Sequence, residues 1–576
     1  MTTTSEDLEA PADRRHRHRA LVVQLVALAT AGAFLLWVNR QQWFLADEWN
    51  MLVERRLVGG DGMLGIWDAH NSHLAVLPTI VYRALFSLFG VRTYLPYLVV
   101  MIIMQLTAAW ILWRLLLRLG IAPTLATLSS LAFAIFGHGF EITTGAFGMQ
   151  NAGALAFGFG ALLAMRETPT IERRDGLVLA LALGALLTSS GVAIPLTAVL
   201  VLVALVRRGW RPAALLLAVP AGTFVFWYVL YGEPATKVQG ALGVSEGLRR
   251  VPTFVAHGIW WTLQYLLDVD SGGPIVLLAA ALLVAVTLRW RERAWQVASC
   301  IAAGAPLYLA LTTFGRGGFG LGVAGNSRYS YIVIAFLLPV LTLAVDRLAR
   351  RFAIGPTVAV VALVVLVGLQ AVGLERKASQ SAPIEQETKR RLVAAALVLR
   401  DGIRPVGAPV PEFEPGLDAT EVEQLDRDGD LPGNVRPSAA DLLTARLYLE
   451  VATVEAEPLG SAYPVQALVV GGAAVHPARI AGCVRTERLE PGDDVRLSFP
   501  AGGSVRVDAD EPSYELVLAL AQAGVRSRER PAFLPPTLEL VVVDVAKAPT
   551  LLLGPRTVAT TLRICGAEAG ATPARE

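Results

Sequence analysis

Two neighbouring carboxylates stand just after the first long apolar stretch of this sequence. Asp47 and Glu48 lie in F-L-A-D-E-W-N (44–50), and Glu141 lies in a second polar segment, 138–151. A carboxylate near a membrane surface can act as a general base toward a hydroxyl group. Asp47 and Glu141 could also bind a divalent cation such as Mg²⁺ or Mn²⁺. The alternative is a solvated acidic turn that caps a helix beginning near residue 49.

Two histidines follow in W-D-A-H-N-S-H (67–73), just before another apolar stretch. If helical, His70 and His73 could bind a metal, although this spacing alone is weak evidence. They could also hydrogen-bond a phosphate or a sugar, or simply be polar residues at an interface. Arg83 and Gln150 lie in or at the start of apolar stretches, and we expect them to play supporting roles.

The most informative polar segment is F-G-R-G-G-F-G-L-G-V-A-G-N-S-R-Y-S, residues 314–330. Its glycines allow backbone amides to approach a ligand closely. Arg316 and Arg328 are suited to bidentate phosphate binding, and Tyr329 adjoins the second arginine. The alternative is contact with lipid head groups. We treat the three side chains as candidates for binding a phosphate.

The composition requires a membrane. Of the 576 residues, 54% are hydrophobic and 17% charged, and the mean hydropathy is +0.52. A soluble domain cannot bury so much apolar surface, whereas a bilayer solvates it. The net charge of +2 gives no basis for binding nucleic acid.

Apolar stretches long enough to cross a membrane recur along the first two thirds of the chain. The stretch 176–206 has arginines at both ends and should cross twice, with T-S-S-G (188–191) as its outer turn. The stretches 74–90 and 252–268 fit better along the outer interface, because the arginines between crossings then all become cytoplasmic. The other crossings are expected near 20–38, 94–116, 121–137, 150–166, 213–231, 274–290, 294–313, 330–346 and 356–374.

These rules predict an α-helical polytopic protein of the cell membrane, with about 11 transmembrane helices plus outer interfacial helices. The N-terminus would be cytoplasmic. We expect a basic N-terminus (1–19), a transmembrane core (20–375), a linker with a short helix (376–435) and an extracytoplasmic, mostly β domain (436–576). Short β-type runs separated by turn residues suggest a sandwich. Cys483 and Cys565 in that domain could form a disulfide or remain buried thiols.

Taken together, these features resemble the C-type membrane glycosyltransferases (GT-C fold), which include bacterial arabinosyl- and mannosyltransferases. The resemblance covers about residues 20–375. It rests on D-E at 47–48, H-N-S-H at 70–73 followed by L-A-V-L-P, and L-F-G at 88–90. F-G-M-Q-N, T-S-S-G and S-R-Y further resemble actinobacterial cell-envelope members without an assigned substrate. Many relatives have H-P-P-L after the first motif, where this sequence has H-N-S-H-L.

The resemblance implies transfer of a sugar from a polyprenyl-phosphate donor to a glycan or lipid acceptor of the cell envelope, on the outer face and among membrane lipids. Asp47 would be the general base for the acceptor hydroxyl. Glu48 or Glu141 would orient the acceptor or hold a divalent cation. Arg316 and Arg328 would bind the donor phosphate. His73 and Arg83 would assist at the interface.

Three other functions remain open from the sequence. A transporter or flippase of lipid-linked saccharide should have charged residues at mid-membrane and paired broken helices, but the charges here cluster at the outer rim. A non-catalytic scaffold that presents the β domain to a glycan would tolerate the loss of Asp47. A polysaccharide ligase would use the same membrane class and a lipid-linked donor.

Overall fold

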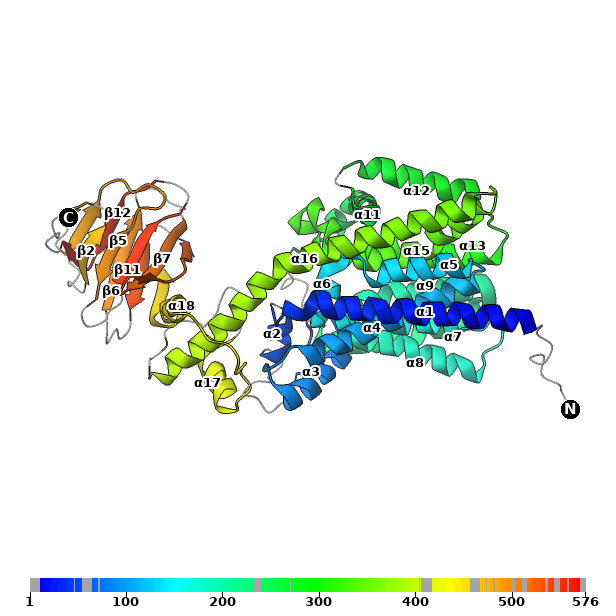
Figure 1. Ribbon diagram of the computed structural model, residues 1–576, viewed down its shortest axis with the longest axis horizontal. Helices are drawn as coiled ribbons and strands as arrows, with labels where there is room; N and C mark the ends of the chain where they lie inside the picture. The colour runs from blue at the N-terminus through cyan, green and yellow to red at the C-terminus, as the bar shows by residue number, and fades with distance from the viewer. Residues whose placement is uncertain are drawn as a thin grey trace. The chain divides into compact units, whose positions relative to one another are not determined.

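The computed structural model is mostly helical and ends in two β-sheets (Figure 1). The chain divides into two compact units. Unit 1 comprises Met1–Trp43, Asp61–Leu88 and Tyr94–Pro383, and unit 2 comprises Phe44–Gly60, Phe89–Thr93 and Ile384–Glu576. The structure describes residues 11–45, 47–53, 65–70, 73–232, 240–269, 271–402, 405, 417–455, 467–472, 474–479, 482–499, 503–509, 515–533, 537–542, 550–556 and 559–569.

Unit 1 is a bundle of apolar helices. Helix α7 packs on both α4 and α8, α9 packs on α10, and α1 packs on α4 and α5 (Figure 1). The helices are α1 (Pro11–Val38), α3 (Val76–Phe89), α4 (Leu95–Arg118), α5 (Pro123–Ala134), α6 (Phe140–Thr143), α7 (Met149–Ala164), α8 (Arg173–Thr188), α9 (Ser190–Arg208), α10 (Trp210–Tyr231), α11 (Val244–Leu266), α12 (Gly273–Thr287), α13 (Arg293–Ala302), α14 (Gly304–Arg316), α15 (Ser327–Ala349) and α16 (Gly355–Arg400).

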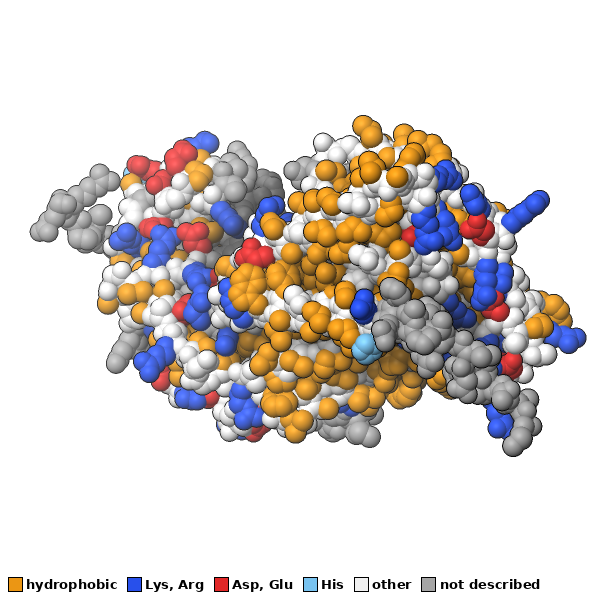
Figure 2. All heavy atoms as spheres, turned by 45° about the vertical axis from the view of Figure 1, so that its right-hand side comes forward, with side chains coloured by type: hydrophobic (Ala, Val, Ile, Leu, Met, Phe, Trp, Pro, Cys, Tyr) orange, Lys and Arg blue, Asp and Glu red, His pale blue; other side chains and the backbone are white. Residues whose placement is uncertain are grey.

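The predicted fold class of a polytopic α-helical membrane protein is confirmed. Among the described residues, nine helical stretches are long and apolar enough to cross a membrane. The two other expected crossings correspond to α8 and α12, which are 16 and 15 residues long. The two stretches assigned to the interface, now α3 and α11, are not among the nine. Figure 2 shows hydrophobic side chains covering the flank of the helices, with a group of Lys and Arg side chains beyond them on the right.

Unit 1 contains a buried ion pair. Arg208, at the end of α9, donates to both carboxylate oxygens of Asp175 in α8, at 2.6 and 2.9 Å. It also donates to the carbonyls of Thr168 and Thr170, each within 2.9 Å. The two charged side chains are 0% and 7% exposed. The bonds close the loop between α7 and α8 onto α9.

Helix α16 differs from its prediction. The expected linker began at residue 376, but the helix continues without interruption to Arg400 and includes Pro383. The apolar residues of this segment end near Glu375, but the helix continues for about 25 more residues. The end of the apolar stretch is therefore not the end of the helix. Two shorter helices follow, α17 (Ala419–Arg427) and α18 (Ala439–Glu450), and a capping box begins each of them.

The end of unit 2 contains two sheets. One has the order β1-β10-β6-β12-β4-β3, and the other β13-β2-β5-β11-β7-β8, with β9 paired to β7. All pairs are antiparallel except β13 with β2. The strands are β1 (Val451–Glu455), β2 (Ala467–Gly472), β3 (Val475–Pro477), β4 (Cys483–Thr486), β5 (Val495–Ser498), β6 (Gly503–Ala509), β7 (Glu515–Gln522), β8 (Val525–Arg526), β9 (Arg530–Phe533), β10 (Thr537–Val542), β11 (Thr550–Pro555), β12 (Leu562–Cys565) and β13 (Ala567–Ala569).

Buried leucines and valines from both sheets, together with Ile564 and Phe499, share one core, as the alternation of apolar and polar residues along the strands requires. Cys483 of β4 faces Cys565 of β12 in the strand register, and the two form a disulfide. The third cysteine, Cys300, is a buried free thiol in α13. The C-terminal mostly-β region is thus present as predicted.

Candidate functional site

The histidine loop of unit 1 turns sharply before α3. His70 and His73 form an antiparallel bridge, and each backbone amide donates to the other residue's carbonyl at 2.8 Å. The backbone amide of Leu74 donates to the hydroxyl of Ser190 at 2.9 Å, and the amide of Ser190 donates back to the Leu74 carbonyl at 3.2 Å. Upstream, the indole of Trp227 donates to the carbonyl of Trp67 at 2.7 Å. The loop is therefore fixed to α9 and α10.

The break between α8 and α9 lies where T-S-S-G predicted an outer turn. Ser189 has an extended backbone (φ −162°, ψ 105°), and α9 begins at Ser190. Gly191 lies against the His73 ring, where an added Cβ would stand 3.0 Å from His73 Cε1. A side chain larger than hydrogen at residue 191 would displace the imidazole. The turn therefore supports the histidine loop.

The glycine-rich segment lies between α14 and α15 and carries both candidate arginines. Arg316 ends α14, two short 3₁₀ turns follow (η5, Gly317–Phe319, and η6, Leu321–Gly325), and Arg328 stands in the first turn of α15. Gly320 has a φ of +95°, in the region that favours glycine. The guanidinium of Arg250 in α11 donates to the Gly317 carbonyl at 3.0 Å. The backbone between the two arginines is thus held by its own turns and by α11.

The structure brings His73 into the field of both arginines. Surrounding protein atoms disfavour the charged imidazolium, and the positive charges of Arg316 and Arg328 act in the same direction, so that the pKa of His73 falls to about 4. The side chain still reaches the protein surface. His73 is a neutral hydrogen-bonding group near pH 7.

Glu141 of α6 approaches the second arginine from another segment. Arg328 Nε lies 3.9 Å from a carboxylate oxygen of Glu141, and the two side chains are 43% and 41% exposed. The hydroxyl of Ser327 accepts from the Glu141 backbone amide at 3.1 Å. The Arg328 guanidinium also lies over the ring of Tyr329, 5.5 Å from its centroid. Tyr329 itself is buried, with its ring edge-on to Tyr308.

A third contact closes the glycine-rich segment onto the membrane part of unit 1. One ring nitrogen of His138 lies 3.1 Å from the Gly325 carbonyl, and the ring stacks on Tyr265 of α11 with centroids 3.3 Å apart. Leu266, the residue after Tyr265, lines a groove of about 650 Å³ formed by α11, α12, α15 and α16. Apart from Ser129 and Thr342, the groove is lined by apolar side chains. A long hydrocarbon chain suits such a surface.

These contacts join four polar segments that the sequence placed on one side of the membrane. Residues 67–70, 73–74, 138–147, 188–191 and 314–329 meet at one end of the bundle. His70 belongs to this group, since it is buried with its ring 5.0 Å from that of Phe147. Gln150 is half-buried at the start of α7, and Arg83 is half-buried on α3.

The remaining acidic candidates belong to unit 2. Asp47 begins α2 (Asp47–Leu52) and is half-buried. Glu48 is buried, and its carboxylate accepts from the backbone amide of Leu45 at 3.0 Å. Glu48 thus fixes the turn that presents Asp47. In the described part of the chain, no group of three or more His, Cys, Asp and Glu side chains could hold a metal ion.

Sequence reasoning missed the contributions of Ser190, Gly191 and His138. T-S-S-G was interpreted only as a break between crossings, and its residue types do not predict a contact with His73. A glycine and a serine at a helix start occur for many reasons. The contact between residues 73 and 191 depends on how α3 and α9 pack, which spacing along the chain does not give.

Comparison with solved structures finds a similarity to a membrane protein of known structure. The crystal structure of ArnT from Cupriavidus metallidurans bound to undecaprenyl phosphate is similar to this chain, with a TM-score of 0.43 and 12% sequence identity. The match covers 74% of this chain and 92% of that chain. No protein-family model matches the sequence, and no curated protein does. A similarity of this size does not identify an activity, which has to be inferred from the residues of this chain.

Proposed function

We propose that this protein is a membrane glycosyltransferase that takes its sugar from a polyprenyl-phosphate donor and passes it to a glycan or lipid acceptor of the cell envelope. The observation that carries the proposal is the meeting of Arg316 and Arg328 around a neutral His73, at the end of an apolar helix bundle. Two guanidinium groups and a glycine-rich backbone suit a phosphate. The groove near Tyr265 suits the polyprenyl chain.

The proposed reaction needs charge stabilisation at the phosphate. The acceptor hydroxyl attacks the anomeric carbon, the bond from that carbon to the phosphate oxygen breaks, and the polyprenyl phosphate leaves with an additional negative charge. Arg316 and Arg328 would stabilise that charge as it develops. His73 would donate or accept a hydrogen bond without adding a positive charge to the site.

The acceptor proton requires a base, and we assign this role to Asp47. It stands at the start of α2, and Glu48 holds the preceding backbone in place. An ionised carboxylate accepts the proton as the hydroxyl oxygen attacks. Glu141 is then left as a partner of Arg328, where it offsets part of the arginine's charge before the donor binds.

The test is transfer of radiolabelled sugar from a panel of polyprenyl-phosphate sugars to cell-wall acceptors, using membranes that contain the wild-type protein or Asp47→Asn. Asp68→Asn is the matched control, since Asp68 is an exposed carboxylate 21 residues further along the chain. We expect transfer by the wild type and the control and loss of at least about 100-fold in Asp47→Asn. Transfer that survives in Asp47→Asn removes this residue as the base. Absence of transfer from every donor contradicts the proposed function.

A further inference from the structure

A second, strongly basic cavity lies at the opposite end of unit 1, among the ends of α1, α4, α7, α8 and α15. Its volume is about 1240 Å³. Six of its lining residues are basic, and none is Asp or Glu: they are His18, Arg114, Arg118, Arg166, Arg174 and Arg350. The rest of the lining includes leucines of α1, α4 and α8, such as Leu21, Leu117 and Leu177. One cavity thus combines a ring of positive charge with an apolar wall.

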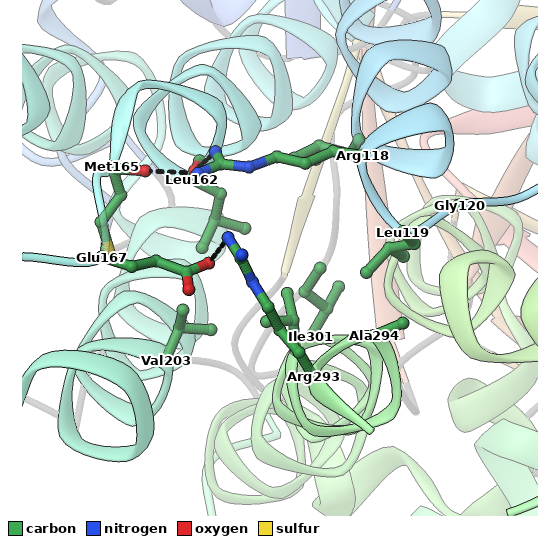
Figure 3. Close-up of a pocket in the computed structure, with 12 residues that line it drawn as sticks. Arg118, Leu119, Gly120, Leu162, Met165, Glu167, Val203, Arg293, Ala294 and Ile301 are labelled. Atoms are coloured by element: carbon green, nitrogen blue, oxygen red, sulfur yellow. Dashed lines mark hydrogen bonds and ion pairs between the residues drawn. The ribbon is translucent and has the colours of Figure 1, made fainter. Parts of the chain in front are cut away.

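The neighbouring cavity shows what a charge-balanced site looks like at this end. It has a volume of about 380 Å³ and contains Glu167 (Figure 3). Glu167 forms ion pairs with Arg207, at 2.7 Å, and with Arg293. Figure 3 also shows Arg118 donating to the carbonyl of Met165, at 2.8 Å. In the smaller cavity, Glu167 and a backbone carbonyl pair with the arginines, whereas the larger cavity has no carboxylate in its lining.

Two of the arginines in the basic cavity, unlike Arg118 and Arg350, form no bonds to other described residues that would hold the helices together. Arg118 donates to backbone carbonyls at the end of α7, and Arg350 pairs with the buried Asp346 at 2.8 Å. Within the described part of the chain, the exposed guanidinium groups of Arg114 and Arg174 make no hydrogen bond or ion pair. They remain available to a ligand.

We infer that the basic cavity binds an anionic phospholipid of the leaflet at this end, with the phosphodiester between Arg114 and Arg174 and the acyl chains along the leucines. The like charges gathered there repel one another, and a phosphodiester relieves that repulsion while its chains cover the apolar wall. A lipid fits better than a free anion because the lining is both basic and apolar. The lipid would connect α4 with α8 on the side where α1 packs on α4.

The experiment is native mass spectrometry of the purified full chain in a neutral detergent, titrated with phosphatidylglycerol or phosphatidylcholine. The test variant is Arg114→Gln with Arg174→Gln. The matched control is Arg19→Gln with Arg173→Gln, since these exposed arginines adjoin lining residues in sequence but do not line the cavity. Each arginine near an anionic lipid contributes a factor of about five, so the test variant should bind phosphatidylglycerol about 25-fold more weakly. Phosphatidylcholine binding should not change.

A variant with lysine at both residues 114 and 174 separates charge from folding, because it keeps the positive charge and should retain most of the affinity. Equal phosphatidylglycerol affinities for the test variant and the matched control would overturn the inference. Equal binding of the two lipids by the wild type would overturn it too, since the cavity would then be an apolar surface only. Displacement of the lipid by equimolar inorganic phosphate would show a small-anion site and would likewise contradict it.

Discussion

Replacing Arg328 and Glu141 one at a time separates a donor-binding role from a catalytic one. The two side chains approach to 3.9 Å, and each is more than 40% exposed. Exposed ion pairs of this kind contribute about 0–1 kcal/mol. Arg328→Gln removes a cation from the proposed phosphate site, whereas Glu141→Gln removes only the carboxylate that competes with the phosphate for that cation.

The expected magnitudes differ enough to be distinguished. A hydrogen bond to a charged group contributes about 1.5–3 kcal/mol, so Arg328→Gln should weaken binding of polyprenyl phosphate roughly 10- to 150-fold. Glu141→Gln should leave affinity unchanged or tighten it by up to about fivefold, because at most about 1 kcal/mol of competing attraction is lost.

Binding of polyprenyl phosphate without a sugar is the appropriate assay, since it does not depend on which sugar the protein transfers. The purified full-length protein is titrated with the lipid, and intrinsic tryptophan fluorescence or thermophoresis reports the dissociation constant. An Arg328→Gln variant that binds as tightly as the wild type would refute the assignment of the phosphate site. An equal loss of affinity in Glu141→Gln would refute the view that Glu141 only balances the arginine.

Three other perturbations test individual interactions of the fold. Asp175→Asn leaves Arg208 buried without a counter-charge, so it should lower the free energy of unfolding by about 3–5 kcal/mol. Thermal unfolding in detergent measures this change. An unchanged unfolding midpoint would contradict it. Cys565→Ser opens a disulfide that joins residues 82 apart, so it should lower the free energy of unfolding of the β region by about 4–5 kcal/mol. A proteolysis assay measures this loss. An equal effect of reductant on wild type and variant would contradict it. The pKa of His73 is about 4 in the folded protein and about 6.5 in the unfolded chain. Between these pH values the unfolded chain therefore binds more protons than the folded protein. The free energy of unfolding should then fall as the pH drops from 6.5 toward 4. The fall should be smaller in His73→Gln, and identical pH profiles of thermal unfolding would contradict the assigned pKa.

The sequence predicted the bundle because length and arginine distribution constrain a membrane protein strongly. The T-S-S-G segment was placed correctly as a break between two helices, because α8 ends at Thr188 and α9 begins at Ser190. The same reasoning did not show that Arg208 is buried against Asp175. A positive-inside count records on which side an arginine lies, and contains no information about which carboxylate it meets.

The candidate site was predictable in its residue types and not in its geometry. Arg316 and Arg328 stood out because they lie in a glycine-rich segment where positive charge was not expected. Their proximity to His73 depends on the packing of α14 and α15 against the histidine loop, across more than two hundred residues of sequence. The continuation of α16 to Arg400 was missed because polar composition was taken to mean the end of the helix.

Photocrosslinking of the donor lipid would show directly whether Arg316, Arg328 and His73 surround its phosphate. A polyprenyl-phosphate sugar with a diazirine in its first isoprene unit is irradiated with the full-length protein in membranes, and the labelled peptides are identified by mass spectrometry. We expect labelling within residues 65–75 and 314–330, and less labelling there in the double variant Arg316→Gln with Arg328→Gln. Labelling that is confined to other segments, or that does not change in this variant, would contradict the proposed donor site.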